Sequence, residues 1–529
     1  MFQTFAASSD ASAIPERIKR LRALLAEEGL QALLLPRGDE HQGEYVAPGS
    51  ERLKWLTGFS GSAGLVAVTR RHAGLFVDGR YTVQARAECG GGPFEFPGIS
   101  QAHLLPWLKS KLKSGDVVGF DPWLHTVSQI ERLGRALKTH GIALKPTRRN
   151  LIDVLWGKER PAAPDHPVVP HPIKYSGRTA ESKIAAVQKV LKEAGHDAVV
   201  LTAPDSVCWL FNIRGSDVAH NPVALAFAIV PATGKPELFL AAKRLTREAV
   251  TQLDGVVKIS PSGALKARLQ ALRKAGRRVR VDSDRAAWWF SRALGKSAVR
   301  GDDPCVAMKA IKNATEIKGA RVAHVRDGAA VVRFLAWLDG AIAAGETVDE
   351  IGAATALEAQ RAGSQALKEI SFDTISGSGP NGAIVHYRVT EATNRVLKPG
   401  ELFLLDSGAQ YLEGTTDITR TVAIGAPSSE MRERFTLVLK GHIAIATARF
   451  PKGTRGIDLD PFARRALWAH GLDYDHGTGH GVGSYLSVHE GPQSISRAGF
   501  AVLEPGMIIS NEPGYYKEGA YGIRIENLV

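Results

Sequence analysis

The sequence has few cysteines and no long apolar segment. Its three cysteines, Cys89, Cys208 and Cys305, are far apart in a chain of 529 residues. This spacing excludes a disulfide framework and a CxxC zinc site, and scarce cysteine is typical of a reducing cytoplasm. No stretch reaches the roughly 18–20 apolar residues that span a bilayer, and the first residues lack the pattern of a secretory signal. We therefore expect a cytoplasmic protein without membrane partners.

The sequence also lacks the short motifs of two large enzyme classes. There is no GxxxxGK phosphate loop, and no GxSxG elbow that would indicate a serine hydrolase. What is present is an ordinary globular composition, with 44% hydrophobic and 23% charged residues. At roughly 100–200 residues per domain, the length predicts about three domains.

Charge is divided unevenly along the chain. Residues 331–529 contain 18 Lys+Arg and 23 Asp+Glu, a net of −5, whereas the preceding residues carry a net of +18. Basic residues gather at Lys145, Arg148 and Arg149 and again over 266–280. Such groups can bind nucleic acid, but no nucleic-acid signature accompanies them. We therefore interpret them as solvated helical faces and expect no nucleic-acid partner.

Two N-terminal segments resemble each other. Residues 17–36 have the pattern of an amphipathic helix, a stop at Gly29 and a short buried strand. Residues 183–204 repeat this order, with Gly195 as the stop. The proline-rich residues 157–173 between them are typical of a linker. The pattern predicts a divergent repeat of one α/β domain.

The pattern changes near residue 305. Residues 307–343 predict a long helix with an interruption near Gly328, and a second helix fits 348–362. Short strands with glycine turns follow, separated by helices at 429–450 and near 458–470. This third region is therefore predicted to be α+β.

Isolated acidic residues follow apolar runs in this third region. Asp406 ends LFLLD, Asp417 lies in TTDITRT, and a glycine turn at 413–414 would bring the two together. Glu512 and Glu526 follow MIISN and GIRI, with another glycine midway between them. A carboxylate that is buried without a partner is costly, and four together would repel one another.

One histidine has a similar setting. His480 lies in HGTGHGVG, where the glycines allow close approach of the backbone. Four carboxylates and one imidazole suit two hard or borderline divalent ions, such as Mn²⁺, Co²⁺ or Zn²⁺. His476 is four residues earlier, but the glycines between the two argue against a helical HExxH arrangement.

Several long motifs occur together and in order. They are WLFNIRGSDVAHNP, VAMKAIKNATEIKGARVAHVRDG, DSGAQYLEGTTDITRT, HGTGHGVGSYLSVHEGP, NEPGYY and GIRIEN. With these motifs the chain resembles the pita-bread metallopeptidases, and specifically the long, three-domain Xaa-Pro aminopeptidases. The resemblance covers essentially the whole chain.

The resemblance implies a mixed α/β and α+β fold. Two related N-terminal α/β domains, similar to creatinase/prolidase N-terminal domains, would occupy residues 1–160 and 161–320. A pita-bread catalytic domain would occupy 321–529. The chain stops at Val529 in an apolar stretch without a turn, so we expect this domain to be C-terminally incomplete.

The resemblance also implies a set of metal ligands. They fall on Asp406, Asp417, His480, Glu512 and Glu526. Asp417 and Glu526 would bridge two divalent ions, for which we expect Mn²⁺, with Zn²⁺ or Co²⁺ as alternatives. Asp406 would complete the shell of one ion, and His480 and Glu512 that of the other.

Further residues correspond to the family's substrate side. They are His386, His476, His489 and Arg524. His386 or His489 would donate to the oxyanion, and Glu512 would pass a proton to the leaving proline nitrogen. His476 and Arg524 would bind substrate. Because residues two apart on a strand share a face, Arg524 and Glu526 should point the same way.

The implied reaction is hydrolysis of the bond between an N-terminal residue and a following proline. A hydroxide held between the two ions would attack the carbonyl. The expected partners are peptides with proline in second position, and a second copy of the chain in a homodimer. Specificity for proline rests on the resemblance alone.

Two other functions stay open. A prolidase would act on Xaa-Pro dipeptides, but the two N-terminal domains favour the aminopeptidase. A pita-bread domain without catalysis would bind proteins, but all five ligand identities are retained.

Overall fold

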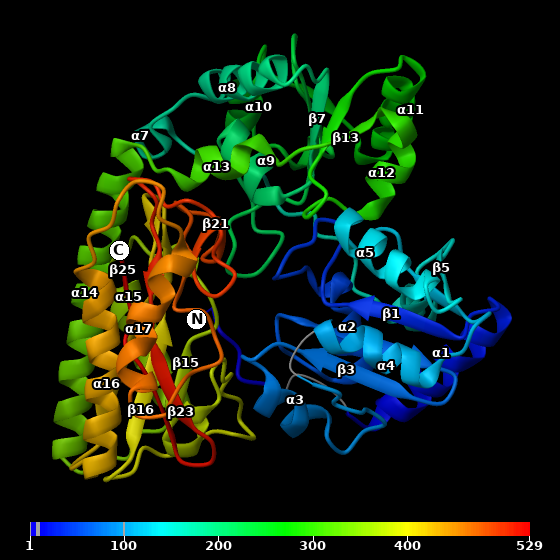
Figure 1. Cartoon of the computed structure of the whole chain (residues 1–529). Coiled ribbons are helices and arrows are strands. Elements are labelled where there is room, and N and C mark those ends of the chain that lie inside the picture. Colours follow the sequence, from blue (N-terminus) through cyan, green and yellow to red (C-terminus); the bar gives the residue numbers. More distant parts are fainter. Residues whose placement is uncertain (1, 7–10, 99–100) are drawn as a thin grey trace.

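The chain folds into three parts, each with its own sheets and helices (Figure 1). The computed structural model describes residues 2–6, 11–98 and 101–529. In Figure 1 the first part lies at the right in blue and cyan, the second at the top in teal and green, and the third at the left, from the green helix α14 through yellow to red. Among the described residues, no helix is long and apolar enough to cross a membrane.

The first part is a five-stranded sheet with the order β3-β2-β1-β4-β5. The central strand β1 is buried throughout, and it pairs antiparallel with β2 and parallel with β4. Helix α1 packs Ile18, Leu21 and Leu25 into the core beside it. The elements are α1 Ile14–Glu27, β1 Ala32–Pro36, α2 Arg52–Thr57, β2 Gly64–Thr69, β3 Ala73–Val77, α3 Thr82–Cys89, α4 Leu104–Lys111, β4 Val117–Phe120, α5 Val127–Lys138, β5 Ala143–Pro146 and α6 Leu151–Trp156.

The second part repeats this topology and adds one edge strand. Its sheet has the order β11-β10-β9-β7-β12-β13, with β7 antiparallel to β9 and parallel to β12. Gly29 and Gly195 end the equivalent helices with φ of 67° and 64°, a conformation that glycine adopts without strain. The predicted repeat is thus confirmed. The elements are β6 Val169–Pro170, α7 Ile173–Ser176, α8 Ala180–Glu193, β7 Ala198–Leu201, α9 Pro204–Phe211, β8 Ile213–Arg214, β9 Phe227–Pro231, β10 Glu237–Phe239, α10 Arg247–Leu253, β11 Lys258–Ser260, α11 Leu265–Lys274, β12 Val279–Val281, α12 Trp288–Leu294, β13 Ala298–Arg300 and α13 Pro304–Ala310.

The third part places four long helices outside small antiparallel sheets (Figure 1). Strands β15, β16 and β19 form one sheet, and β14, β17 and β18 another. The remaining strands form the pairs β20–β21, β22–β25 and β23–β24. The elements are α14 Ala314–Ala343, α15 Glu350–Ala362, β14 Glu369–Ile370, β15 Ile375–Ser378, β16 Leu402–Ser407, β17 Ala409–Tyr411, β18 Gly414–Thr415, β19 Ile418–Ala423, α16 Ser429–Ala446, α17 Gly456–Trp468, β20 Gly479–Gly481, β21 Glu490–Ile495, β22 Ser510–Asn511, β23 Gly514–Lys517, β24 Tyr521–Arg524 and β25 Asn527–Leu528.

The predicted long helix is interrupted, but not at Gly328. The break lies at residues 311–313, between α13 and α14, and α14 continues through Gly328. Asn313 caps α14 through a capping box with Glu316, which satisfies amide groups at the helix start. The interior glycine costs only about 1 kcal/mol relative to alanine, so the 30-residue helix tolerates it.

A buried group of ion pairs joins the second part to the third. Lys309 Nζ lies 2.9 Å from Asp205 Oδ2 and 3.0 Å from Glu490 Oε2, and Lys312 also pairs with Glu490. Burial alone would lower the pKa of Lys309, but Asp205 and Glu490 raise it above its usual value. We call these four residues the α13 ion network. It holds two positive and two negative groups, so its formal charge is balanced.

Candidate active site

The pairing of strands in the third part explains how five distant side chains meet. Asp406 lies on β16 and Asp417 immediately precedes β19, and these strands are antiparallel partners. Both carboxylates therefore lie at the same end of one hairpin. His480 lies on β20, Glu512 follows β22, and Glu526 lies between β24 and β25.

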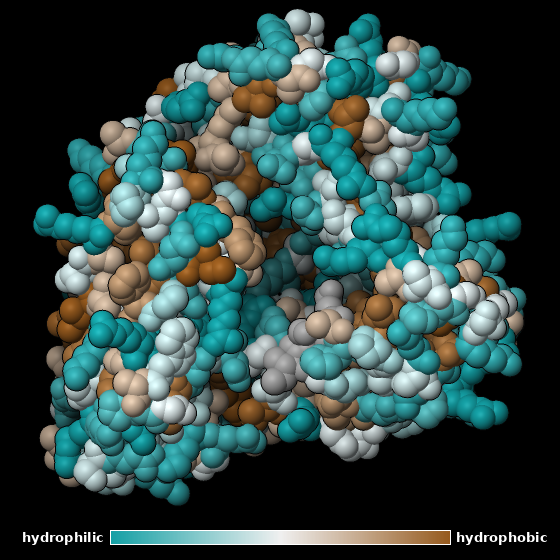
Figure 2. Space-filling view, viewed as in Figure 1, coloured by the Kyte–Doolittle hydropathy of each residue, from teal (hydrophilic) through white to brown (hydrophobic). Residues whose placement is uncertain are grey.

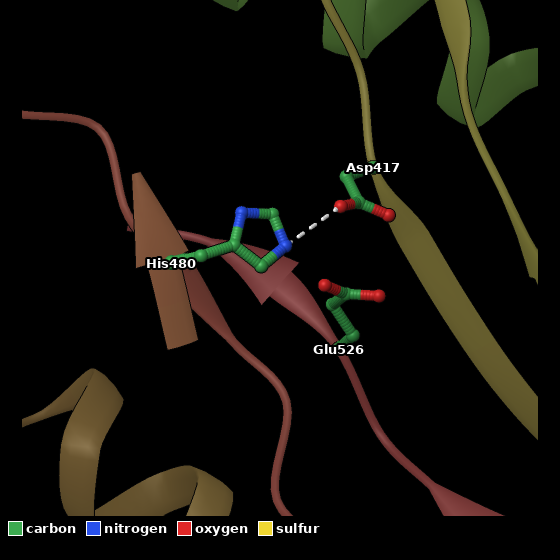
Figure 3. Close-up of side chains that lie close together, drawn as sticks. All are labelled: Asp417, His480 and Glu526. Atoms are coloured by element: carbon green, nitrogen blue, oxygen red, sulfur yellow. Dashed lines mark ion pairs between the residues drawn. The ribbon is translucent and has the colours of Figure 1, made fainter. Parts of the chain in front are cut away.

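Asp417, His480 and Glu526 form the centre of the cluster (Figure 3). One ligand atom from each lies within 4.8 Å of the others. His480 Nε2 lies 3.4 Å from Asp417 Oδ2 and 3.5 Å from Glu512 Oε1. The Nδ1 atom of the same ring lies 2.9 Å from the Gly481 carbonyl oxygen, which can only accept. In the neutral ring Nδ1 therefore carries the proton, and the lone pair of Nε2 faces the carboxylates.

Asp406 lies beside this centre with half of its carboxylate unpaired. Arg524 donates to Asp406 Oδ2 at 2.7 and 3.2 Å. Asp406 Oδ1 is buried and has no hydrogen-bond partner among the described residues. An unsatisfied buried acceptor costs free energy. This oxygen is therefore suited to a ligand that the protein itself does not supply.

The cluster contains more negative than positive charge. Burial raises the pKa of Glu526 well above its usual value, and Asp417, Asp406 and Glu512 raise it further. Burial alone would lower the pKa of His480, but Asp417 and Glu512 raise it to about 9. Carboxylate oxygens and one imidazole nitrogen are donors that divalent metal ions accept. The residues present therefore fit a divalent metal site.

Tyr516 connects two of the predicted substrate-side residues. Its hydroxyl lies 2.8 Å from His476 Nε2 and accepts a hydrogen bond from Arg524 Nη1 at 2.7 Å. Burial lowers the pKa of His476, and Arg524 lowers it further, to about 3. His476 is therefore neutral at pH 7. Arg524 contacts both Asp406 and Tyr516, so it lies between the carboxylates and the histidine.

The first part contributes side chains to this site that were not predicted from the sequence. The Tyr81 hydroxyl lies 2.9 Å from His386 Nδ1, and Glu44 Oε2 lies 2.7 Å from His489 Nδ1. Arg80 in turn donates to Glu44 at 3.0 Å. These contacts join residues 305 and 445 positions apart, and no motif marks Glu44, Arg80 or Tyr81. Only the folded arrangement of the parts reveals them.

One cavity of about 840 Å³ is lined by most of these residues, but Arg524 is buried behind Asp406 and does not line it. Its lining includes all five predicted ligands together with His386, His476 and His489. The opposite wall comes from the first part and includes Glu44, Arg80 and Tyr81. Figure 2 shows a hollow in the middle of this face of the molecule, between the first and third parts. The size is that of a site for a small molecule or a short peptide.

Family models match three consecutive segments. Residues 17–153 and 159–316 each match the Creatinase/Prolidase N-terminal domain, and residues 318–529 match Metallopeptidase family M24. The fold and the site together define a pita-bread metallopeptidase that is preceded by two related α/β domains. The predicted fold class is therefore confirmed.

Similar proteins of known name indicate a narrower family for the chain. A protein of Aspergillus fumigatus named "Probable Xaa-Pro aminopeptidase P" is 42% identical over 99% of this chain and 82% of its own length. A protein of the same name from Ajellomyces dermatitidis is 40% identical, over 97% of this chain and 86% of its own length. The chain belongs to the Xaa-Pro aminopeptidase P family.

Solved structures agree with this assignment. The X-prolyl aminopeptidase of Caenorhabditis elegans is described as a cytosolic enzyme with a di-nuclear active site. It superposes with a TM-score of 0.93 at 37% identity, covering 97% of this chain and 87% of its own. An Xaa-Pro dipeptidase of Bacillus anthracis reaches a TM-score of 0.54 at 25% identity, covering 66% of this chain and 94% of its own. The likeness to the dipeptidase is thus limited to two thirds of the chain.

Proposed function

We propose that the protein removes an N-terminal residue that precedes proline, as an Xaa-Pro aminopeptidase with two divalent metal ions. The observation that carries this proposal is the buried cluster of four carboxylates and His480, with an unpaired oxygen on Asp406. The names of the similar proteins support the substrate class.

Five residues would hold the ions: Asp406, Asp417, His480, Glu512 and Glu526. Asp417 and Glu526 are proposed as shared ligands because the family resemblance implies it, and both lie in the centre of the cluster together with His480. When bound, the ions would lower the pKa of a water and polarise the scissile carbonyl. We propose Mn²⁺, with Zn²⁺ and Co²⁺ as alternatives that the same donors accept.

The surrounding histidines are placed to act on the substrate. Burial lowers the pKa of His386 well below its usual value, and Arg80 lowers it further. If the Tyr81 hydroxyl donates to Nδ1 of the neutral ring, the Nε2 proton is left for a developing oxyanion. His489 is oriented by Glu44 and is the second candidate for this role.

Glu512 is proposed to shuttle a proton to the leaving proline nitrogen. Its carboxylate lies in the cavity, and Ser510 donates to Oε1 at 3.0 Å. Burial raises its pKa above the usual value, although His480 and Arg524 oppose that shift. A raised pKa suits a carboxyl group that takes up and releases a proton near neutral pH. His476 and Arg524 are proposed to hold the substrate.

Glu44 supports an aminopeptidase rather than an endopeptidase. Burial alone would raise its pKa, but His489 and Arg80 keep it well below the usual value. Its carboxylate is therefore ionised in the cavity and suits a free ammonium group. A peptide whose N-terminus binds there would present its first peptide bond to the cluster.

The proposal is tested with three peptides at saturating Mn²⁺. Arg-Pro-Pro should be cleaved after arginine, whereas Arg-Ala-Pro should be cleaved at least about a hundredfold more slowly. The dipeptide Arg-Pro separates the alternatives, because preference for it over Arg-Pro-Pro would indicate a prolidase. If no peptide is cleaved with Mn²⁺, Zn²⁺ or Co²⁺, the protein is not a peptidase and the non-catalytic alternative holds.

We also propose that the protein is a cytoplasmic homodimer. Large apolar side chains are exposed on α16 and α17 and in the segments that follow them; they are Ile443, Phe450, Phe462, Trp468 and Phe500. Exposed apolar groups of this kind are typical of protein interfaces. Light scattering should give twice the chain mass of 56.8 kDa. Trp468→Glu should reduce that mass, whereas Val154→Glu, at a partly exposed valine of α6 in the first part, should not.

A further inference from the structure

The two basic groups of the sequence meet across one cavity between the first and second parts. This cavity has a volume of about 450 Å³. Arg148 and Arg149 line it from the segment after β5, and Lys266, Arg273 and Arg292 line it from α11 and α12. We call it the basic cavity. It shares no lining residue with the cavity of the candidate active site.

Most cations of the basic cavity have no counter-charge. Arg149 lies 3.3 Å from Glu28, but no ion pair involves Arg148, Lys266, Arg273 or Arg292 among the residues that the structure describes. Asp121 is the carboxylate in the described lining, and its oxygens accept from the Trp123 amide and from Asn150. These basic side chains are exposed to solvent, so together they form a positively charged recess that attracts anions.

Basic residues near the cavity behave differently. Arg268 lies on the same helix as Lys266 and pairs with Glu237 at 3.0 Å. Arg277, just after α11, pairs with Asp197 at 3.2 Å. The basic residues of this segment thus fall into two groups: Arg268 and Arg277 have carboxylate partners, whereas Lys266 and Arg273 in the lining, and Lys274 outside it, have no ion pair among the described residues.

The walls of the basic cavity are fixed to each other. The Trp289 amide donates to the Pro122 carbonyl at 2.9 Å, and the Trp288 amide donates to the His125 carbonyl at 2.8 Å. The Trp123 and Trp289 rings stack with centroids 3.9 Å apart. In Figure 1, α12 accordingly lies beside α5 on the right. The cavity is therefore preformed, and a ligand would not need to order its walls.

We propose that the basic cavity binds an oligophosphate anion, either inorganic or as part of a nucleoside polyphosphate. Guanidinium groups match phosphate oxygens in pairs, and several cations facing one cavity suit a ligand with several negative charges. The volume is within the range of about 300–1,000 Å³ for small-molecule sites. The cations come from two sides of a recess that is open to solvent rather than from one stripe along a helix, which suits a compact anion; a nucleic-acid strand is the competing ligand in the test below.

Binding is measured by calorimetry on the metal-loaded protein with excess Mg²⁺, so that the ligand does not remove the bound metal. The probes are tripolyphosphate and ATP. Both should bind, and their affinity should fall as salt rises. Equal affinity would mean that the phosphates alone are recognised, and tighter binding of ATP would mean that the tryptophan pair contributes. Either result supports the site.

Variants test whether the anion binds in the basic cavity. Arg148→Gln with Arg273→Gln should weaken binding at least tenfold, whereas Lys274→Gln, on the same helix outside the lining, should change it less than twofold. Each variant is first shown to retain its circular dichroism and its peptidase rate. The proposal is overturned if wild-type protein binds neither probe. It is also overturned if the double variant binds as wild type does, or if a single-stranded oligonucleotide binds more tightly than both probes.

Discussion

Two buried charge clusters of this molecule differ in one respect. The α13 ion network pairs two lysines with two carboxylates and is balanced within itself. The carboxylate cluster of the candidate active site has four acidic groups against two basic ones, Arg524 beside Asp406 and His480 beside Asp417 and Glu512. A balanced cluster is complete as folded, whereas an excess of carboxylates favours the binding of a cation or of protons. The difference separates a structural cluster from a functional one.

The two clusters are also connected along the chain. Glu490, in the balanced network, directly follows His489, which faces the unbalanced cluster through its ring contact with His480. The network thus anchors the start of β21 beside the candidate site. The α13 ion network therefore supports the candidate active site, and each of the two clusters can be perturbed separately.

The largest effect is expected from removing a central ligand. Glu526→Ala and Asp417→Ala should each lose bound metal and lower kcat/KM by about a thousandfold or more, because metal catalysis supplies several kcal/mol. Metal content by mass spectrometry and cleavage of Arg-Pro-Pro are the measurements. Glu346→Ala, which removes an exposed carboxylate of the same part, is the control. An active and fully metal-loaded Glu526→Ala protein would contradict the assignment.

Neutralising one carboxylate in each cluster should have opposite effects on the metal-free protein. Glu490→Gln removes the negative charge that Lys309 and Lys312 share, so it should cost about 3–5 kcal/mol of stability. Glu526→Gln removes a repelled charge, so it should leave stability unchanged or raise it. Urea unfolding after chelation measures both. Equal losses in the two variants would mean that the carboxylate cluster is not unbalanced.

A smaller effect concerns a second contact between the second and third parts. His220 pairs with Glu369 at 3.1 Å and with Asp373 at 3.3 Å. Burial alone would lower its pKa, but the two carboxylates raise it from 6.5 to about 9. The interaction of His220 with the two carboxylates therefore stabilises the fold fully below pH 6.5. This stabilisation is lost as the pH rises through about 9.

The change at His220 is at most about 3.4 kcal/mol, at about 1.36 kcal/mol for each unit of pKa. His220→Gln should abolish this part of the pH dependence, as measured by unfolding at a series of pH values. His470→Gln, at an exposed histidine, is the control. A pH profile that is identical in His220→Gln and wild type would exclude the charged pair.

The smallest effect is expected at the wall formed by the first part. Tyr81→Phe removes the hydroxyl that lies 2.9 Å from His386 Nδ1, and it should lower kcat/KM about tenfold, the effect of roughly 1.4 kcal/mol. Tyr175→Phe, outside the cavity, should leave the rate unchanged. If Tyr81→Phe has the same rate as wild type, His386 does not depend on this contact.

Local pattern was enough to predict much of the fold. Alternating apolar runs and glycine turns predicted the hairpin that joins Asp406 to Asp417, and the repeated helix, glycine and strand predicted the two N-terminal sheets. These features depend on neighbours within a few tens of residues. The break before α14 was missed, although Asn313 and Glu316 have the spacing of a capping box.

The opposite wall of the site could not be predicted in this way. Glu44 and Tyr81 reach their histidines only because the first part folds back over the third. Neither residue lies in a local sequence pattern that marks it as part of a site. The same applies to the basic cavity. Its two groups of basic residues could be recognised in the sequence, but that they line one cavity depends on how the first two parts pack. Contacts between different parts of the chain can be identified only from the structure.

The central claim is that the unbalanced carboxylate cluster becomes a peptidase centre when it binds two divalent ions. Titration of Mn²⁺ into the metal-free protein tests it directly, with bound metal and cleavage of Arg-Pro-Pro measured on the same samples. Cleavage should be absent at the start and should reach its plateau when two ions are bound per chain. Full cleavage by the metal-free protein, or saturation of metal binding without any cleavage, would contradict the claim.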